Sequence, residues 1–567
     1  MLNLHQESVL RAQLRTLHHA IHTKADVHPI SSSLTALMRH GGLYTLLDPD
    51  IMAARMGSVA VDSAGRARLA GLVPNLQAAV GSFFSRLVPD QPYMIPSSLM
   101  SHIAFPHEGA AYTSDRDEKE HPSKYVSPEI PAVFTFVGQF IDHDLTMNAV
   151  NLFEPQEDPI FPTPPGAAPI PNPIVDGASP LIDLDSVYGP RAKLGAPLNA
   201  LYEGDKFRLV SANGITDLPR DADGTATIAD KRNDENQLIL QIHLLVQRMH
   251  NKFVEDGASF EEARRQTIYN WQFMMLNDYL PRIIQAETLT FVLTQIGLPD
   301  FGELKHKPCR DLATGMLRVS MPHEFAIGFR FGHSQLKRGY KLNNSYPEGS
   351  LLFDNSLVGT GPDGTGYDDL RGGRTLRAKN HIEWPTFFAS SAPVLSNRID
   401  RKVTARVFDL PESAIPDDIK YIGNLPHRNL IRSRQVGLCS GEALAKFYGI
   451  AAMAPEQIEP AASKRDLYEQ NERRQPGELR IFETPLWYYI LREAELTNGP
   501  SPNASKLGPL GSRLVAEVIV GAIAYAPLSV AKDPSWKSTI PGALSDPGAP
   551  SDHLRNIIRC VNDLSAF

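Results

Sequence analysis

The chain has 567 residues, of which 42% are hydrophobic and 21% charged, and its formal net charge is −8. This composition indicates a folded globular protein with a large core and excludes an intrinsically disordered chain. The mild negative charge also argues against nucleic acid as a general partner. The three cysteines, Cys309, Cys439 and Cys560, are widely spaced. They form no disulfide framework or metal-binding pair, and we expect ordinary buried thiols.

The N-terminus carries charges throughout and lacks the uninterrupted apolar stretch of a secretory signal. No apolar run reaches the roughly 20 residues needed to span a bilayer. The longest, VAEVIVGAIAYAPL from Val515, is too short and contains a glutamate. We therefore expect a soluble protein without a membrane span, either cytoplasmic or exported without a leader. The oligomeric state is left open.

Helical periodicity dominates the chain. Apolar residues recur at three- and four-residue steps from Pro131 to Leu145, and Pro131 suits a first helical turn. A second long helix is expected around Leu238–Phe253 because the same period recurs there. A third helix begins at the capping box Ser259-Phe-Glu-Glu and is expected to end at Pro281.

Alternation of the strand type is scarce, and two long segments, residues 151–180 and residues 353–374, are rich in proline or in glycine and aspartate. We predict a mostly α fold, in which a single large helical domain with long loops and little β covers residues 101–530. An N-terminal extension, residues 1–100, is expected to pack on this core, and residues 531–567 are expected to form a C-terminal wrap.

The segment GQFIDHDLT, residues 138–146, places one imidazole between two carboxylates. Successive side chains of a helix turn by about 100°, so Gln139 shares a face with Asp142 and His143, whereas Asp144 points elsewhere. Taken alone, these residues fit a metal site, a catalytic base with helpers, or a buried histidine in a charged turn. The last alternative is favoured for so short a motif.

A second acidic cluster lies in SPLIDLDSVYG, which begins at Ser179. On an extended segment, Ser179, Asp183 and Asp185 present alternating oxygen atoms, and backbone carbonyls lie between them. Asp144 is a further carboxylate for the same site. Calcium binds six to eight such oxygens, often from two chain segments. The spacing is not that of an EF-hand, and a solvated acidic turn is the alternative.

Three more segments combine charge with helical spacing. Arg232 and Glu235 lie three residues apart in RNDE, where the alternative is a surface ion pair. Arg330 and His333 lie one turn apart in FRFGH, where the alternative is a core histidine. The glycine before His333 has no side chain and would let a flat group approach. The segment NLIRSR, residues 429–434, has a basic helix edge as its alternative.

Taken together and in this order, GQFIDHDLT, RNDE, FRFGH and NLIRSR resemble the motifs of the animal-type haem peroxidases in the peroxidase–cyclooxygenase superfamily. The resemblance runs from about Pro131 to Val520, and four ordered motifs are far more specific than any single one. It implies a helical haem-peroxidase fold that holds haem b and calcium. It also implies that hydrogen peroxide is reduced and that phenols or halides are oxidised through a ferryl intermediate.

The resemblance assigns roles around the distal side of the haem. His143 matches the distal histidine, which moves the peroxide proton as a general acid–base. Gln139 matches the glutamine that holds water or halide beside it, and Arg232 matches the arginine that stabilises charge as the O–O bond breaks. Asp142 and Glu235 match the carboxylates that, in many members, form ester bonds to the haem methyl groups.

On the proximal side, His333 matches the ligand of the haem iron, and Asn429 matches the amide that accepts the free N–H of this imidazole. Arg330 and Arg432 match the family's arginines near the proximal side and a haem propionate. The mammalian granulocyte enzyme carries a methionine directly after the ester-forming glutamate and makes a sulfonium link there. This chain has Asn236 at that place, so two ester links at most are expected.

The family's calcium site matches five residues of this chain, namely Asp144, Ser179, the backbone of Leu181, Asp183 and Asp185. Asp185 stands where serine often occurs, and its carboxylate is still a good calcium ligand.

The fatty-acid dioxygenases of the same superfamily are the first alternative. They carry a radical-forming tyrosine three residues before the proximal histidine, where this chain has Arg330, and they usually lack the ester-forming acids. A catalytically silent calcium-binding interaction module is the second alternative. Such a protein should lose the distal histidine or arginine, and this chain has both. A peroxidase is therefore the preferred interpretation, and its reducing substrate is left open.

Overall fold

The computed structural model describes residues 82–88, 91–93, 95, 97–104, 112–146, 175–176, 178–189, 200–212, 214–222, 224–310, 317–354, 368–388, 393–411, 423–458, 483–498, 505–542, 550–562 and 564. Most of the expected N-terminal extension, most of the proline-rich segment 151–180 and the centre of segment 353–374 lie outside the described residues. The domain boundaries expected near residues 100 and 530 stay predictions.

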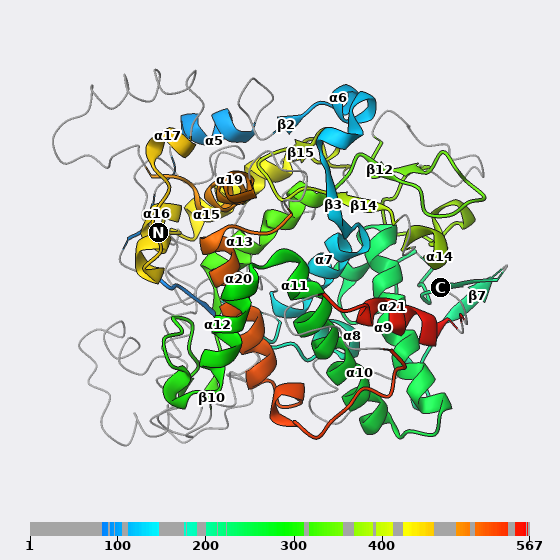
Figure 1. The fold of residues 1–567 in the computed structure, drawn as a ribbon. Coiled ribbons are helices and arrows are strands. Elements are labelled where there is room, and N and C mark those ends of the chain that lie inside the picture. Colours follow the sequence, from blue (N-terminus) through cyan, green and yellow to red (C-terminus); the bar gives the residue numbers. More distant parts are fainter. Residues whose placement is uncertain are drawn as a thin grey trace, which may run out of the picture.

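The predicted mostly α fold is confirmed, because helices pack through the body of the molecule and the strands of the described residues form only short ladders of two or three strands (Figure 1). The α-helices are α5 Ser97–Ala104, α6 Asp115–Glu120, α7 Val133–Leu145, α8 Asp185–Tyr188, α9 Gln237–Glu255, α10 Phe260–Met274, α11 Leu280–Ile283, α12 Ala286–Ile296, α13 His323–Gly328, α14 Trp384–Phe387, α15 Leu425–Gln435, α16 Gly441–Tyr448, α17 Pro455–Ile458, α19 Leu486–Asn498, α20 Pro509–Tyr525 and α21 His553–Val561.

Single turns of 3₁₀ helix are η1 Pro122–Lys124, η3 Lys231–Asp234, η5 Pro299–Phe301, η7 Ala378–Asn380, η8 Ala405–Val407 and η11 Val530–Lys532, and a longer 3₁₀ segment is η6 Phe329–Gln335; a π-helical turn is η4 Met275–Tyr279. The strands are β1 Ser82–Ser85, β2 Tyr112–Thr113, β3 Val126–Pro131, β4 Val175–Asp176, β5 Tyr202–Glu203, β6 Lys206–Phe207, β7 Val210–Ala212, β8 Ile215–Asp217, β9 Cys309–Arg310, β10 Leu317–Arg318, β11 Met321–Pro322, β12 Gly339–Tyr340, β13 Ser350–Leu351, β14 Leu395–Asn397 and β15 Val403–Thr404.

Several strand pairs join segments that are far apart in the sequence. The largest sheet has the order β11-β1-β4, in which β1 is parallel to β11 and antiparallel to β4. Strand β3, which leads into α7, is antiparallel to β14. Within the described residues no larger sheet occurs, so helix packing holds the fold together.

Helix α7 begins two residues later than predicted. Pro131 ends strand β3 and pairs with Leu395, so it does not lie in the first helical turn. Proline is tolerated at the end of a short strand at the edge of its pair, where its missing N–H is not needed. The apolar residues of α7 are buried as the periodicity predicted, and the helix packs against α9.

The next two helices confirm the predicted starts. Asn236 caps α9 by accepting hydrogen bonds from the amides of its first turn, and Ser259 caps α10 by accepting one from the amide of Glu262. The predicted stop at Pro281 is wrong, because the helical course passes through the π-helical turn η4 into α11 and ends at Ile283. Pro281 lies in the first turn of α11, where a missing N–H is harmless.

The segment FRFGH is helical, but α13 ends at Gly328 and the chain continues as the 3₁₀ helix η6. A Cβ atom on Gly328 would lie 2.8 Å from Cδ1 of Ile490 and 2.9 Å from Cδ2 of Leu514, so α19 and α20 approach this backbone closely. Helix α20 also packs along α12, and α21 packs on α9 near the C-terminus (Figure 1). Among the described residues, no helix is both long enough and apolar enough to cross a membrane.

Candidate active site

A cavity of about 310 Å³ lies between α7, η3 and η6. Most of the predicted distal and proximal residues line it together, namely Gln139, Asp142, His143, Arg232, Glu235, Arg330 and His333. The other lining side chains include Tyr279, Phe329, Phe331, Leu352, Phe353 and Arg428. Residues from three separate motifs therefore meet at one largely apolar pocket that holds a few charged groups, the usual composition of a small-molecule site.

His143 is held from behind by an amide. Its side chain is 5% exposed, and its Nδ1 lies 2.9 Å from Oδ1 of Asn233. On the other side of the ring, Nε2 lies 3.8 Å from Oε1 of Glu235. The imidazole is thus oriented at Nδ1, while Nε2 lies toward the carboxylate that lines the cavity.

The guanidinium of Arg232 is anchored by Asp230. Nη2 of Arg232 donates to Oδ2 of Asp230 at 2.7 Å and Nε to Oδ1 at 3.1 Å, and Nη2 also donates to the carbonyl of His143 at 2.9 Å. Burial alone lowers the pKa of Arg232, but the charge of Asp230 outweighs it and raises this pKa above its ordinary value. Burial likewise works to raise the pKa of Asp230, and Arg232 outweighs it and lowers that pKa. The arginine is therefore a fixed, permanent cation.

Glu235 and Gln139 are linked across the cavity wall. Nε2 of Gln139 donates to Oε1 of Glu235, and Oε1 of Gln139 accepts a hydrogen bond from Nδ2 of Asn236 at 3.1 Å. Oδ1 of Asn236 accepts from the first amides of α9, at 3.1 and 2.9 Å. One asparagine side chain thus caps a helix and fixes the orientation of Gln139.

The structure brings Asn429 to His333, but not in the predicted orientation. Nδ2 of Asn429 lies 2.9 Å from Nδ1 of His333, and Oδ1 of Asn429 accepts a hydrogen bond from Nη1 of Arg330 at 3.2 Å. The predicted acceptor atom is therefore turned toward Arg330, because a guanidinium can only donate. Burial first, and the cations of Arg330 and Arg428 second, lower the pKa of His333 to about 3, so the ring is neutral at pH 7.

Arg432 is not among the residues that line the cavity, and its place near a haem propionate stays a prediction. Helix α15 meets the cavity at its first turn, through Leu425 and Arg428. Arg432 lies one turn farther along, near the buried His323, whose pKa is lowered first by burial and then by the charges of Arg86 and Arg432. The cation that α15 contributes to the cavity is therefore Arg428.

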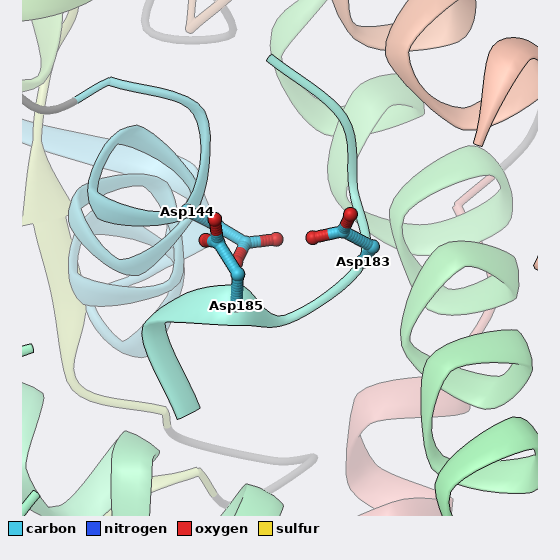
Figure 2. Close-up of side chains that lie close together, drawn as sticks. All are labelled: Asp144, Asp183 and Asp185. Atoms are coloured by element: carbon cyan, nitrogen blue, oxygen red, sulfur yellow. The ribbon is translucent and has the colours of Figure 1, made fainter. Parts of the chain in front are cut away.

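Asp144 leaves the cavity side of α7 and lies with two other carboxylates. Figure 2 shows the side chains of Asp144, Asp183 and Asp185 pointing toward one another from α7 and from the segment around α8. One oxygen from each lies within 4.8 Å of the others. Asp144 is fully buried, and burial, followed by the charges of Asp185 and Asp183, raises its pKa well above the ordinary value.

Groups around this cluster donate hydrogen bonds to its carboxylates, and one residue there has a left-handed backbone. Leu184 has a φ of 58°, a left-handed conformation that is unfavourable by about 1–2 kcal/mol for a residue with a side chain. Its amide donates to Oδ2 of Asp144 at 3.0 Å. Ser179 is also present, with Oγ donating to Oδ2 of Asp183 at 3.0 Å. The carbonyl of Leu181 accepts a hydrogen bond from the amide of Asp183 at 3.1 Å, so only its second lone pair is left for an ion.

Part of the chain is similar to known haem peroxidases. The family model for animal haem peroxidases matches residues 154–361, which include Arg232, Glu235 and His333. Over this part of its length the chain is similar to the animal haem peroxidases. Heme peroxidase 2 of Caenorhabditis elegans is 23% identical over 308 residues, which are 44% of this chain and 41% of that protein. Chorion peroxidase of Aedes aegypti is 25% identical over 195 residues, which are 30% of this chain and 24% of that protein.

Two solved structures share the fold of this chain. Peroxidase A from Dictyostelium discoideum matches with a TM-score of 0.53 and 16% identity, over 80% of this chain and 90% of that one. A fatty acid alpha-dioxygenase from Arabidopsis thaliana matches with a TM-score of 0.50 and 14% identity, over 97% of this chain and 89% of that one. The matched part of this chain spans less than half the length of each of the two curated relatives.

The residues of the cavity fit a haem group. A Cβ atom on Gly332 would meet only Oε1 of Gln335, at 4.0 Å, so the backbone beside His333 borders open space that a flat group can approach. His333 is neutral, the form of imidazole that binds metals, and Arg330 and Arg428 are cations suited to carboxylates.

The residues of the acidic cluster fit a calcium ion. Three carboxylates, two of them buried, lie close enough to share one cation. Burying several like charges is unfavourable unless a cation or a proton compensates them. All the donors are oxygens, which hard cations such as calcium prefer.

Three polar residues in or behind the cavity wall were missed by reasoning from the sequence. Asn233 holds His143, Asp230 holds Arg232, and Arg428 lines the cavity. Asp230 carried a usable signal, because its side chain accepts from the amide of Arg232 two residues later, as a cap of η3. Asn233 carried none, since its partners come from α7, α8 and α9.

Proposed function

We propose that this protein is a haem peroxidase that reduces hydrogen peroxide and oxidises a small donor, a phenol or a halide. The observation that carries the proposal is that His143 and His333, which are far apart in the sequence, line one cavity together with Arg232. A histidine with a purely structural role in the core would not need to face a second histidine and an arginine across a cavity. These side chains would supply, at one place, the three roles that peroxide cleavage requires, namely an acid–base, a fixed cation and an iron ligand.

Bound haem would supply an iron atom that exchanges electrons with peroxide, and His333 would bind this iron. Nε2 of His143 would take the proton from one oxygen of peroxide and return it to the other oxygen, which departs. Arg232, held by Asp230, would stabilise the negative charge that develops as the O–O bond breaks. Gln139, fixed by Glu235 and Asn236, would hold a water molecule or halide beside them.

The cofactor would be haem b, with its propionates beside Arg330 and Arg428. Asp142 and Glu235 both line the cavity, which supports their proposed role in ester bonds to haem methyl groups. Haem that stays with the protein through acid–acetone extraction in the wild type, and is released from the Asp142→Asn/Glu235→Gln double variant, is the expected result. Complete extraction from the wild type would exclude ester links.

The second proposed ligand is calcium, bound by Asp144, Ser179, Asp183, Asp185 and the backbone of Leu181. The buried charge of this cluster supports it. Because Asp144 directly follows His143 on α7, the ion would hold the helix that carries the acid–base residue.

The proposal is tested with two variants of the haem-supplemented protein. His333→Ala should lose the Soret band because it lacks the iron ligand. His143→Ala should keep the band and react with peroxide about 10²–10⁴ times more slowly, because only the acid–base residue is missing. A wild type that never acquires a Soret band would refute the proposal. So would a His143→Ala variant that reacts with peroxide at the normal rate.

A fatty-acid dioxygenase is the second candidate, and Tyr279 is the observation that favours it. This tyrosine lines the same cavity, where a radical-forming phenol would have to lie, although Arg330 occupies the place before His333 that is tyrosine in the dioxygenases. Oxygen consumption on adding a polyunsaturated or saturated fatty acid without peroxide separates the two. Rapid consumption favours the dioxygenase, and turnover of phenols or halides with peroxide favours the peroxidase.

A further inference from the structure

Asn233 connects three parts of the molecule that surround the distal side of the cavity. Its side chain is fully buried on η3. Oδ1 lies 2.9 Å from Nδ1 of His143, and Nδ2 lies 3.1 Å from Nδ1 of His243 and 3.5 Å from the carbonyl oxygen of Ser186. Ser186 directly follows the aspartate pair of the acidic cluster, and its amide donates to Oδ1 of Asp144 at 3.3 Å.

These neighbours leave one orientation for the amide. A backbone carbonyl can only accept, so the NH₂ group of Asn233 has to face Ser186. The reverse orientation would place two oxygens against each other in a buried site, where an unsatisfied polar group costs about 1–3 kcal/mol. The carbonyl Oδ1 therefore faces His143.

The orientation of the amide decides which nitrogen of His143 carries the proton. Because Oδ1 of Asn233 can only accept, Nδ1 of His143 must be the donor. A neutral imidazole has one N–H, so its Nε2 keeps a lone pair on the side of the cavity and Glu235. With the reverse orientation Nε2 would be protonated and unable to take a proton.

His243 supports the same arrangement from the far side. Its side chain is fully buried, and its Nδ1 accepts from Asn233. Within the described residues its Nε2 makes no hydrogen bond to the protein. Burial lowers the pKa of His243 to about 3, so it stays a neutral acceptor at pH 7. The contact with His243 therefore helps to orient Asn233.

We infer that Asn233 is a positioning residue that fixes the tautomer of His143, and that the carbonyl of Ser186 and the ring of His243 set its orientation. This inference rests on the proposed peroxidase function. It gives the acidic cluster a second connection to the distal histidine, through Ser186 and Asn233, besides the backbone bond between His143 and Asp144. Loss of a group that orients another site residue typically lowers activity by about 10–100-fold.

The test compares variants of the haem-loaded protein by stopped-flow measurement of the peroxide rate constant, with haem content measured on the same samples. Asn233→Leu has a similar volume and no polar atoms, so it should keep its haem and react about 10–100 times more slowly. Asn233→Asp keeps an acceptor toward His143 but sets an oxygen against the carbonyl of Ser186, so it should recover only part of the rate. If the leucine variant does not fold, Asn233→Ala takes its place.

A double-mutant cycle separates positioning from general weakening of the fold. Asn233→Leu added to His143→Ala should slow the reaction no further, because Asn233 acts only through His143. The matched control is Asn343→Leu, since Asn343 is also buried but bonds only to backbone atoms outside the cavity. It should lower the melting temperature and leave the peroxide rate unchanged.

Two results would overturn the inference and leave the proposed function standing: an Asn233→Leu rate equal to that of the wild type, or an equal fall in rate with and without His143. A wild-type protein that binds haem but does not react with peroxide would overturn both. The two failures are thus distinguished by the wild-type rate alone.

Discussion

The acidic cluster leads to a sharp prediction for Asp144. Oxygens of its three carboxylates lie within 4.8 Å of one another. At that distance and an effective dielectric constant of about 20, two unit charges repel by about 3.5 kcal/mol. Three ionised carboxylates would therefore oppose folding by about 10 kcal/mol, which is comparable with the whole stability of a typical domain. Either a cation binds or a proton is taken up.

The perturbation is Asp144→Asn, which removes one charge and keeps the shape. In a chelator the wild type takes up a proton at Asp144, because the pKa of this carboxyl is raised, and it then resembles the variant. We expect equal melting temperatures without calcium. With calcium at about 1,000 times its dissociation constant, the wild type gains about 4 kcal/mol and the variant gains little. For 567 residues the unfolding entropy is about 1.2 kcal/mol per kelvin, so the shift is about 3 °C.

The assay is differential scanning calorimetry in calcium and in chelator, with bound calcium counted by atomic absorption. Asp256→Asn is the matched control, since Asp256 is an exposed carboxylate at the end of α9, paired with Lys252. It should keep the full calcium shift. The reasoning is refuted if chelation leaves the melting temperature of the wild type unchanged, or if Asp144→Asn retains one calcium per chain and the same shift.

Three other substitutions test the packing and the electrostatics around the site. Burial raises the pKa of Glu493 to about 7 from about 4.5, so the folded protein binds this proton more tightly than the unfolded chain does. The protein therefore loses up to about 3 kcal/mol of stability as pH rises between those values. Glu493→Gln should flatten that part of the pH–stability curve in chemical denaturation, and an unchanged slope would contradict the assignment. Gly138→Ala would put Cβ 2.6 Å from the hydroxyl of Tyr279, so a loss of about 1–3 kcal/mol is expected in the same assay, and a neutral result would show that Tyr279 moves freely. In Gly332→Ala the new Cβ atom would meet only Gln335, at 4.0 Å, so the apoprotein should stay as stable as the wild type. Haem uptake in a titration should weaken. Unchanged uptake would mean that haem does not pack on this backbone.

The local geometry of the site could be predicted from the sequence, because it follows from helical periodicity. The 100° rotation per residue separated Asp144 from His143 and Gln139, and the structure places them at different sites. The capping box at Ser259 likewise predicted the start of α10. These features depend on residues close together in the chain, where spacing fixes direction.

Features that depend on contacts between distant segments could not be predicted in this way. Arg428 and Arg432 lie one turn apart on the same helix, and only the position of η6 decides that the cavity meets Arg428. The orientation of Asn429 depends on Arg330, and the place of Pro131 depends on strand β14. A motif indicates which chemical group a residue offers. The residues that this group contacts depend on how other elements pack around it.

Asn236 limits how this site can be re-engineered. The mammalian granulocyte enzyme uses a methionine at the corresponding place to make a third covalent link to its haem. Here the side chain at this position starts helix α9 and also holds Gln139. Asn236→Met would therefore remove a helix cap, a loss of about 1 kcal/mol, and release the glutamine as well. A designer who wants the sulfonium link in this scaffold has to provide a new start for α9 first.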